Sequence, residues 1–498
     1  MTRVPQLPKQ IYSSAQVRAM DRHAIEVDGI AGFTLMTRAA AASFELLRSL
    51  WPDARNLVVV CGAGNNGGDG YCLARLAHQA GLPVRVLAVG PTARLQGDAL
   101  RARHECQEAG VLLRQFSPED LRSAHVIVDA LFGTGLDRPL DTTFTGPIDA
   151  INASAIPVLS LDIPSGLHAD TGAVMGAAVH AHHTITFVGL KTGLFVGRGL
   201  ALRGGLHFSD LGIPVAPGES GLPALERLDE GFLGEVLHPR ARDAHKGDCG
   251  KVLVVGGGPG MPGAVRLCGE AALRSGAGLV VTAAQPANVL AIVSGRPELM
   301  CHGVEKANQL DELCATADVA VIGPGLGRDR WAKSLFDAML GRSLPLLVDA
   351  DALNLLAQEP RRREDWILTP HPGEAARLLG CETREVQQDR LAAVKELARK
   401  FGGVVVLKGH GTLIAKEGEI PATCDRGNPG MATAGTGDVL AGIITALRAQ
   451  LGDAFQAARA GVLVHALAGD RAAQAGERGM IASDLLAHLR PWLNPPSS

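Results

Sequence analysis

The chain has 498 residues, of which 46% are hydrophobic, 20% charged and 4% aromatic. This is the balance of folded domains with aliphatic cores, and the length suggests more than one of them. The 48 Lys and Arg against 51 Asp and Glu give a net charge of -3, so there is no basic field for nucleic acid or an acidic membrane surface. The apolar runs are strand-sized, well below the roughly 20 residues that cross a bilayer.

The numbers of cysteines and glycines give further information about the class of protein. Nine Cys without disulfide-framework spacing, and a start that lacks the apolar core of a secretion signal, fit a reducing cytoplasm. Glycine occurs 61 times, where average usage predicts about 35. We expect the excess in tight turns beside ligands.

The first part of the chain alternates between two hydrophobic periodicities. Apolar residues at three- and four-residue spacing predict two amphipathic helices between residues 13 and 50. Strands are then predicted at 57–60, 84–89, 126–131, 158–161, 184–188 and 205–208, with helices at 70–80 and 95–109. This alternation predicts an α/β domain, a parallel sheet covered on both faces.

Residues 212–223 are rich in Pro and Gly and lack periodicity, which is typical of a linker. We place the boundary near residue 222, giving domains 1–222 and 223–498. The second domain is predicted to contain strands at 252–255, 279–282, 319–322, 346–348, 366–368 and 404–407, and helices at 264–275, 331–339, 387–400 and 439–449. Because the two parts share no detectable repeat, the chain is predicted to be a fusion of two different α/β domains.

Three polar segments follow predicted strands in the first domain. Residues 61–70 contain five glycines, two Asn and Asp69, at the place where an α/β sheet offers N–H groups to a phosphate. Asp129 ends the third strand, and Asp162 and Ser165 follow the fourth. Because neighbouring parallel strands end at one crevice, we expect these oxygens to meet there and to suit a hard cation. The alternative interpretations are that residues 61–70 form only a glycine-rich turn and that each Asp only caps a helix or a turn.

These segments, with the run at 15–21, resemble the NAD(P)H-hydrate epimerase family over most of residues 12–215. The resemblance implies a Rossmann-like three-layer fold with Asp162 as the first choice for the acid/base, although which Asp moves the proton stays open. It implies K⁺ bound by Asn66, Asp129 and Ser165. It implies hydrated dinucleotide bound by Asn65, Asn66, Gly67, Gly68, Asp69, Gly133, Thr134, Gly135, Leu136, Asp137, Arg138, Pro139 and Asp162.

Two features of the first domain stand apart from this resemblance. Residues 36–40 read Met-Thr-Arg-Ala-Ala, where many relatives carry Met-Glu-Asn-Ala-Gly. His180, His182 and His183 lie close together, but without spaced partner ligands we interpret them as a polar loop rather than a metal site.

The second domain repeats the pattern of strands that end in small or polar residues. Residues 251–260 and 321–327 enter glycine loops, and His371 follows a strand between two prolines. Asp438 follows Gly435, Thr436 and Gly437 at the start of an amphipathic helix. Consecutive N–H groups there could bind a transferred phosphoryl, and Asp438 could accept a hydroxyl proton. The alternative is a plain helix cap.

Residues 240–485 resemble the ribokinase-like fold, and more closely the ADP-dependent NAD(P)H-hydrate dehydratases. The resemblance rests on residues 245–248, 323–327, 349–353, 369–374, 408–412 and 435–438. It implies hydrated dinucleotide at Ala264, Gly327, His371 and Asp438, and nucleotide at Lys408, Gly409, His410, Gly411, Thr412 and Gly437, with His410 in place of the usual small residue. Mg²⁺ and ADP, as phosphoryl donor, are the implied cofactors.

The two resemblances predict one function, the repair of hydrated nicotinamide nucleotides. The first domain would epimerise the R and S hydrates of NADH and NADPH. In the second, Asp438 and an anion hole would turn the hydroxyl of the S hydrate into a phosphate leaving group, at the expense of ADP, with AMP and phosphate as products. We expect a cytoplasmic homo-oligomer without nucleic-acid or membrane partners. The alternative is a ribokinase-like small-molecule kinase with a non-catalytic dinucleotide-binding domain.

Overall fold

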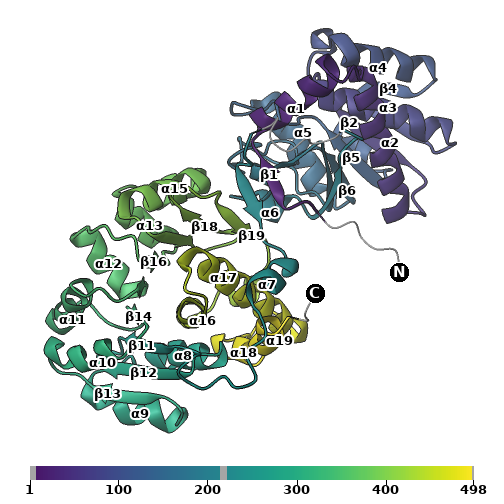
Figure 1. Cartoon of the computed structure of the whole chain (residues 1–498). Coiled ribbons are helices and arrows are strands. Elements are labelled where there is room, and N and C mark those ends of the chain that lie inside the picture. Colours follow the sequence, from purple (N-terminus) through teal and green to yellow (C-terminus); the bar gives the residue numbers. More distant parts are fainter. Residues whose placement is uncertain (1–6, 214–220, 496–498) are drawn as a thin grey trace. The chain divides into compact units, whose positions relative to one another are not determined.

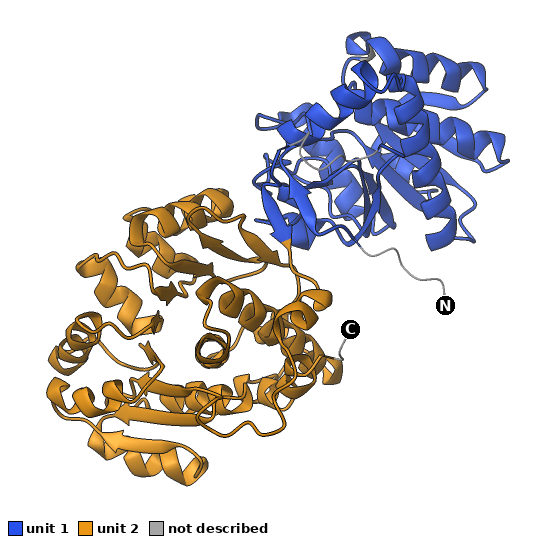
Figure 2. Cartoon of the chain, viewed as in Figure 1, with its two compact units in different colours: residues 1–226 blue, residues 227–498 orange. Residues whose placement is uncertain are grey.

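The computed structural model describes residues 7–213 and 221–495. Figure 2 shows two compact units, residues 1–226 and 227–498. The division lies a few residues beyond the predicted boundary at 222, and most of the predicted linker falls on residues 214–220, outside the described residues.

The first unit is an α/β structure built on a seven-stranded sheet (Figure 1). Its elements are β1 (Gln10–Tyr12), α1 (Ser14–Glu26), α2 (Gly32–Leu50), β2 (Leu57–Cys61), α3 (Asn65–Gln79), β3 (Val84–Ala88), α4 (Gly97–Glu108), β4 (Leu112–Gln115), β5 (Val126–Ala130), α5 (Thr142–Ala153), β6 (Val158–Leu161), β7 (His183–Phe187), β8 (Leu190–Lys191), α6 (Gly199–Leu202) and β9 (Gly205–Ser209), followed by β10 (Leu225–Arg227). The strand order is β4-β3-β2-β5-β6-β7-β9, and every pair is parallel.

Alternation along β2 shows how the layers form. Leu57, Val59 and Cys61 pack against the apolar faces of α1 to α4. Val58 and Val60 point the other way, into a second core with α5. The predicted parallel sheet, covered on both faces, is therefore confirmed. Separately, β1 pairs antiparallel with β10 and parallel with β8.

The second unit holds a larger, mixed sheet. Its elements are α7 (Glu230–Val236), β11 (Lys251–Val255), α8 (Pro262–Arg274), β12 (Leu279–Ala284), α9 (Val289–Gly295), β13 (Met300–Gly303), α10 (Asp311–Ala315), β14 (Val319–Ile322), α11 (Arg330–Leu340), β15 (Leu346–Val348), α12 (Ala350–Gln358), β16 (Trp366–Leu368), α13 (Pro372–Leu379), α14 (Thr383–Gln388), α15 (Arg390–Phe401), β17 (Val404–Leu407), β18 (Thr412–Lys416), β19 (Ala422–Cys424), α16 (Thr436–Leu451), α17 (Ala454–Ala472), α18 (Ala482–Leu486) and α19 (Leu489–Leu493).

Strands β13-β12-β11-β14-β15-β16-β17 are parallel, and β18 and β19 continue the sheet antiparallel. Helices α8, α16 and α17 bury one face of the sheet in a single core. Figure 1 shows α11, α12, α13 and α15 along the other side. The antiparallel hairpin after β17 is an addition to the predicted parallel arrangement.

Two predicted helices have the wrong bounds, and one helix was not predicted. The predicted helix at 387–400 is two helices, because Asp389 interrupts it and its carboxylate caps α15 by accepting from the Ala392 N–H at 2.9 Å. Helix α3 begins at Asn65 rather than at residue 70. Helix α17 was not predicted, because it is buried on nearly every face and shows no amphipathic period.

No helix in the described part of the chain combines the length and the apolarity needed to cross a bilayer.

Candidate active sites

The polar segments of the first unit meet where the strand order reverses. β2 and β5 are neighbours, and the chain runs outward from them in opposite directions, through β3 and through β6. Ligands of open α/β sheets bind at the carboxyl ends of strands at this switch point. The segments that begin after Cys61, Ala130 and Leu161 all leave the sheet here.

The Asn-Asn-Gly-Gly-Asp segment forms the first turns of α3 instead of a loop. Its glycines are needed for close packing, because a Cβ on Gly67 would lie 2.1 Å from the Gly62 carbonyl oxygen. Asn66 is 7% exposed, and its side-chain NH₂ donates to the Phe132 carbonyl at 2.8 Å. Its Oδ1 is buried without a hydrogen-bond partner, which is uncommon for a buried acceptor and calls for an unseen one.

Asp129 is fully buried and organises the neighbouring strand ends. Its Oδ2 accepts from the Ser160 hydroxyl at 2.8 Å and from the Ser165 N–H at 2.9 Å. Burial raises the pKa of Asp129, while these hydrogen bonds oppose the shift. The Ser165 hydroxyl in turn accepts from the Phe132 N–H at 2.9 Å. Asn66 and Ser165 therefore both contact the Phe132 backbone, and Asp129 is connected to it through Ser165.

Asp162 sits in a strained turn directly after β6, with φ at +64°. Its Oδ1 lies 2.5 Å from the ammonium of Lys191, and its Oδ2 lies 2.9 Å from where a Cβ on Gly133 would be. The predicted Asp162 and the predicted loop at 133–139 are thus brought together. Within that loop Leu136 is buried, whereas Asp137, Arg138 and Pro139 are exposed.

Two further carboxyl groups belong to the same charge cluster. Burial raises the pKa of Asp69 well above its ordinary value, and the neighbouring Asp162 and Asp21 add to the shift. Burial also raises the pKa of Asp21, partly opposed by Lys191. Asp21 comes from α1 and Lys191 from β8. Sequence reasoning gave neither residue a role, since nothing in their spacing places them beside Asp162.

The three clustered histidines do not converge on one point. His182 Nδ1 accepts from the Val158 N–H at 3.1 Å, and His183 Nδ1 lies 3.0 Å from His207 Nε2. Among the residues that the structure describes, no group of three or more His, Cys, Asp or Glu could hold a metal ion.

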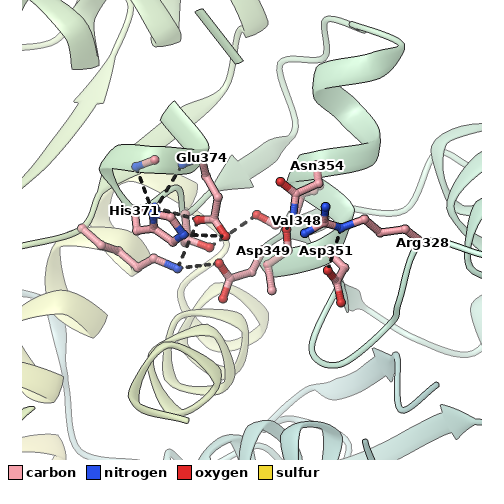
Figure 3. Close-up of polar contacts among 11 residues, drawn as sticks. Arg328, Val348, Asp349, Asp351, Asn354, His371 and Glu374 are labelled. Atoms are coloured by element: carbon pink, nitrogen blue, oxygen red, sulfur yellow. Dashed lines mark hydrogen bonds and ion pairs between the residues drawn. The ribbon is translucent and has the colours of Figure 1, made fainter. Parts of the chain in front are cut away.

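The centre of the second site is a buried ion pair across three strands (Figure 3). The Lys408 ammonium, after β17, lies 2.7 Å from Asp349 Oδ1, after β15, and 3.9 Å from Glu374 Oε2, in α13 after β16. Burial lowers the pKa of Lys408, but Asp349 and Glu374 more than offset this and the net shift is upward. Burial raises the pKa of Glu374 to about 7, against the effect of Lys408.

Asp438 lies in the first turn of α16, and the same ion pair is beside it. A Cβ on Gly437 would lie 3.5 Å from the Lys408 ammonium and 3.9 Å from Asp349 Oδ2. Burial, then the Asp349 carboxylate, raises the pKa of Asp438 to about 7, and Lys408 opposes the shift. A carboxyl group that titrates near neutral pH at a helix N-terminus is suited to general-base work on a hydroxyl.

His371 is the N-cap of α13 and forms a reciprocal cap with Glu374. Its Nδ1 accepts from the Gly373 N–H at 3.0 Å, and its own N–H donates to Glu374 Oε2 at 2.8 Å. Burial and the charge of Lys408 lower the pKa of His371. The neutral imidazole is half exposed beside the ion pair, as Figure 3 shows.

The remaining predicted residues border the same strand ends. The Gly327 N–H donates to Asp351 Oδ2 at 2.9 Å, so the loop after β14 is tied to α12. Ala264, in α8, lies beside that loop, with its Cβ 3.0 Å from where a Cβ on Gly325 would be. Figure 3 shows Asp351 and Arg328 beside Asp349.

The predicted nucleotide segment is the turn between β17 and β18. The buried guanidinium of Arg390 donates to the carbonyls of Leu407, Lys408 and Gly411 at 3.2–3.3 Å. Sequence reasoning missed this support, because Arg390 lies 18 residues before Lys408. Asp349 and Glu374 were part of quoted motifs but were given no role.

Comparisons with known proteins match the two parts of the chain to two different families. Residues 32–193 match the family described as YjeF-related protein N-terminus, and residues 252–491 match the family described as NAD(P)H-hydrate dehydratase. The bifunctional NAD(P)H-hydrate repair enzyme of Coxiella burnetii is 48% identical, over 97% of this chain and 99% of its own. That of Escherichia coli is 44% identical, over 98% and 95%. A solved ribokinase-like superfamily protein from Enterococcus faecalis is 33% identical with a TM-score of 0.51, covering 54% of this chain and 95% of that one.

Proposed function

The chain belongs to the family of bifunctional NAD(P)H-hydrate repair enzymes, and from this premise we propose how its two sites divide the repair. The first unit interconverts the R and S hydrates of NADH and NADPH. The second unit dehydrates the S hydrate to NAD(P)H and consumes ADP. The observation that carries the proposal for the second unit is Asp438, a carboxyl group with a pKa of about 7 beside the Lys408–Asp349 pair.

The dehydration needs the hydroxyl on the nicotinamide ring to become a better leaving group. Asp438 takes the hydroxyl proton, and the oxygen attacks the β-phosphorus of ADP, which releases AMP. The N–H groups at the start of α16 and the Lys408 ammonium stabilise the transferred phosphoryl. The lone pair of the ring nitrogen then expels phosphate and leaves an iminium, and loss of a proton from the neighbouring ring carbon restores the C=C bond of the dihydronicotinamide.

Magnesium fits this site as a partner of the nucleotide. Mg²⁺ usually binds one or two carboxylates and takes its other oxygens from phosphates and water. One or two of the carboxylates of Asp349, Asp351, Glu374 and Asp438 would serve here, and the nucleotide phosphates would supply other oxygens, because no three such groups of the described residues are arranged to hold a metal by themselves. When bound, the ion would neutralise charge that develops on the phosphates.

Potassium fits the first site on the evidence of Asn66. Its Oδ1 is a buried acceptor without a partner, close to the Phe132 backbone and the Ser165 hydroxyl. Asn66 and Ser165, with Asp129 beside them, would hold the ion and fix the loop that follows Phe132. Asp162, with one oxygen directed at that loop, is the proposed acid/base for epimerisation.

A ribokinase-like kinase that forms a stable phosphate ester is less well supported, because His371 stands in the strand-end loop where such kinases often carry Asn. Assembly into a homo-oligomer and a cytoplasmic location stay predictions from the sequence.

The test uses the full chain and each purified hydrate of NADH. We expect Asp438→Asn to slow ADP-dependent dehydration of the S hydrate by at least about 100-fold, the scale of a positioned general base, with epimerisation unchanged. We expect Asp162→Asn to dehydrate the S hydrate normally but to leave the R hydrate unconverted. Restored NADH is measured by its absorbance, and the loss of both activities in either variant would contradict the two-site assignment.

A further inference from the structure

Lys191 is a charged residue inside the first unit, with only 1% of its surface exposed. Its ammonium donates to Asp162 Oδ1 at 2.5 Å, to the Phe187 carbonyl at 2.6 Å and to the Thr186 hydroxyl at 3.0 Å. All three N–H donors are therefore used, and each has a fixed direction. Lysine is almost never buried this fully unless it is paired.

Two strained turns flank this lysine. At Asp162, φ is +64° and the Ile163 N–H donates back to the Leu161 carbonyl at 2.8 Å. At Val188, φ is +66° and the Gly189 N–H donates to the Phe187 carbonyl at 2.7 Å. Both are γ-turns of the rare positive-φ kind, and positive φ is an outlier for β-branched Val188. The turns follow β6 and β7, which are adjacent parallel strands.

Lys191 connects the two turns. It donates to the side chain at the centre of the first turn and to the carbonyl that opens the second. Strained backbone persists only where the surrounding contacts determine it, and such strain gathers at functional sites. The Asp162 N–H also donates to the Ile185 carbonyl at 2.7 Å, so the backbone and side chain of Asp162 are both fixed.

The two oxygens of Asp162 have different surroundings. Oδ1 is occupied by Lys191, with the Thr186 hydroxyl 3.4 Å away. Oδ2 is 2.9 Å from the Cβ position of Gly133, at the start of the predicted substrate loop. The lysine thereby leaves one oxygen of the carboxylate directed at that loop.

We propose that Lys191 is the positioning residue of the epimerase site, which holds Asp162 Oδ1 so that Oδ2 meets the substrate. The inference rests on the proposed role of Asp162. It differs from a purely structural role because Lys191 acts on the reaction through Asp162. The other charged groups that face this pair are Asp69 of α3 and Asp21 of α1.

The experiment compares variants of the full chain in conversion of the purified R hydrate of NADH to the S hydrate, without nucleotide. We expect Lys191→Met to lower kcat by at least tenfold while KM changes less than threefold, because substrate contacts remain and only the reacting carboxylate loses its orientation. Lys191→Arg keeps the charge and should recover part of the lost kcat. The double variant Asp162→Asn, Lys191→Met should be no slower than Asp162→Asn alone.

Three results would overturn the proposal. These are an unchanged kcat in Lys191→Met, a rise in KM that accounts for the whole loss, and a double variant slower than Asp162→Asn by the full factor of the lysine change. Wild-type epimerisation by Asp162→Asn would instead reject the proposed role of Asp162 itself. ADP-dependent dehydration of the S hydrate in the same preparation serves as the internal control.

A second variant decides the matter if Lys191→Met does not fold. Thr186→Val keeps both charges and the side-chain shape but removes one acceptor of Lys191 and one neighbour of Asp162 Oδ1. We expect a several-fold loss of kcat at unchanged KM in a chain that unfolds near the wild-type temperature. A wild-type kcat in this variant would overturn the proposal.

Discussion

The Lys408 ammonium lies 2.7 Å from Asp349 Oδ1, although the two residues are 59 positions apart in the sequence. Asp349 is 1% exposed, so its charge has little access to water. In the function proposed above, a nucleotide phosphate that contacts Lys408 shares or replaces Asp349 as the partner of the ammonium. The proposal therefore connects the stability of the second unit with nucleotide binding.

Removing one member of this pair should destabilise the second unit more than removing both. Lys408→Met leaves a buried carboxylate without its partner, and breaking a buried pair costs about 3–5 kcal/mol. The double variant Lys408→Met, Asp349→Asn should recover much of that loss. Urea unfolding followed by Trp fluorescence measures this, because Trp331, Trp366 and Trp492 lie in this unit. Additive losses in the double variant would show that the two groups do not interact.

Dehydration should depend on pH through Asp438. Its pKa is raised from 3.8 to about 7, so the base form is lost below about pH 7 and not below pH 4. We expect kcat/KM to fall about tenfold per pH unit on the acidic side of 7, since kcat/KM reports the free enzyme. Glu374 also has a pKa of about 7, so Glu374→Gln is the control. If kcat/KM of Asp438→Asn still falls below about pH 7, another group is responsible for the pH dependence.

The raised pKa of Asp438 also makes the stability of the second unit depend on pH, and stability falls with rising pH whereas activity increases. The folded-state pKa of Asp438 exceeds its unfolded value, so the stabilising contribution of the protonated form is complete below about pH 4 and is lost as pH rises through about 7. Asp438→Asn should therefore raise the melting temperature of the second unit at pH 8, although it removes activity. The gain should shrink toward pH 5. An equal shift at both pH values would contradict this account.

Much of the fold followed from local patterns in the sequence. Strands such as β6, β14, β15 and β17 begin and end where the aliphatic runs do, because buried parallel strands are apolar on both faces. Helix α17 did not follow, since a helix buried on all sides carries no amphipathic signal. Asn65 and Asn66 were expected in a loop, and they are helical because glycines at 67 and 68 allow close packing of α3.

In the candidate sites, too, some residues could be proposed from local sequence pattern and others could not. Asp129, Asp162 and Asp438 could be proposed from the sequence because each lies at or directly after the end of a strand or in the first turn of a helix. Lys191 and Arg390 could not be found, since each acts on a segment distant in sequence and their side-chain directions depend on tertiary packing. Buried cations that support a site leave no local signature.

Epimerisation should depend on a monovalent cation of the size of K⁺. The buried Oδ1 of Asn66 has no hydrogen-bond partner, and leaving such an acceptor unsatisfied costs about 1–3 kcal/mol. Replacing K⁺ by tetramethylammonium should lower both the epimerisation rate and the melting temperature of the first unit. Asn66→Leu, which removes the acceptor, should abolish this cation dependence. Wild-type behaviour in tetramethylammonium would reject the cation site.

The start of α3 gives the sharpest stability contrast in the first unit. A Cβ on Gly67 would lie 2.1 Å from the Gly62 carbonyl oxygen, a backbone atom that cannot move without shifting the strand end after β2. Gly64, at the N-cap of the same helix, has nothing within 4 Å of its Cβ position and a negative φ of -107°. The two positions differ in available space and share one helix.

Gly67→Ala should therefore displace α3 from the sheet, lower the melting temperature of the first unit by many degrees and remove epimerisation. Gly64→Ala should cost about 1 kcal/mol or less, the difference between Gly and Ala as an N-cap, and is the matched control. Dehydration of the S hydrate should be the same in both variants, because it belongs to the second unit. If Gly67→Ala were as stable as Gly64→Ala, the close contact between α3 and Gly62 would not be what fixes Asn66 in the site.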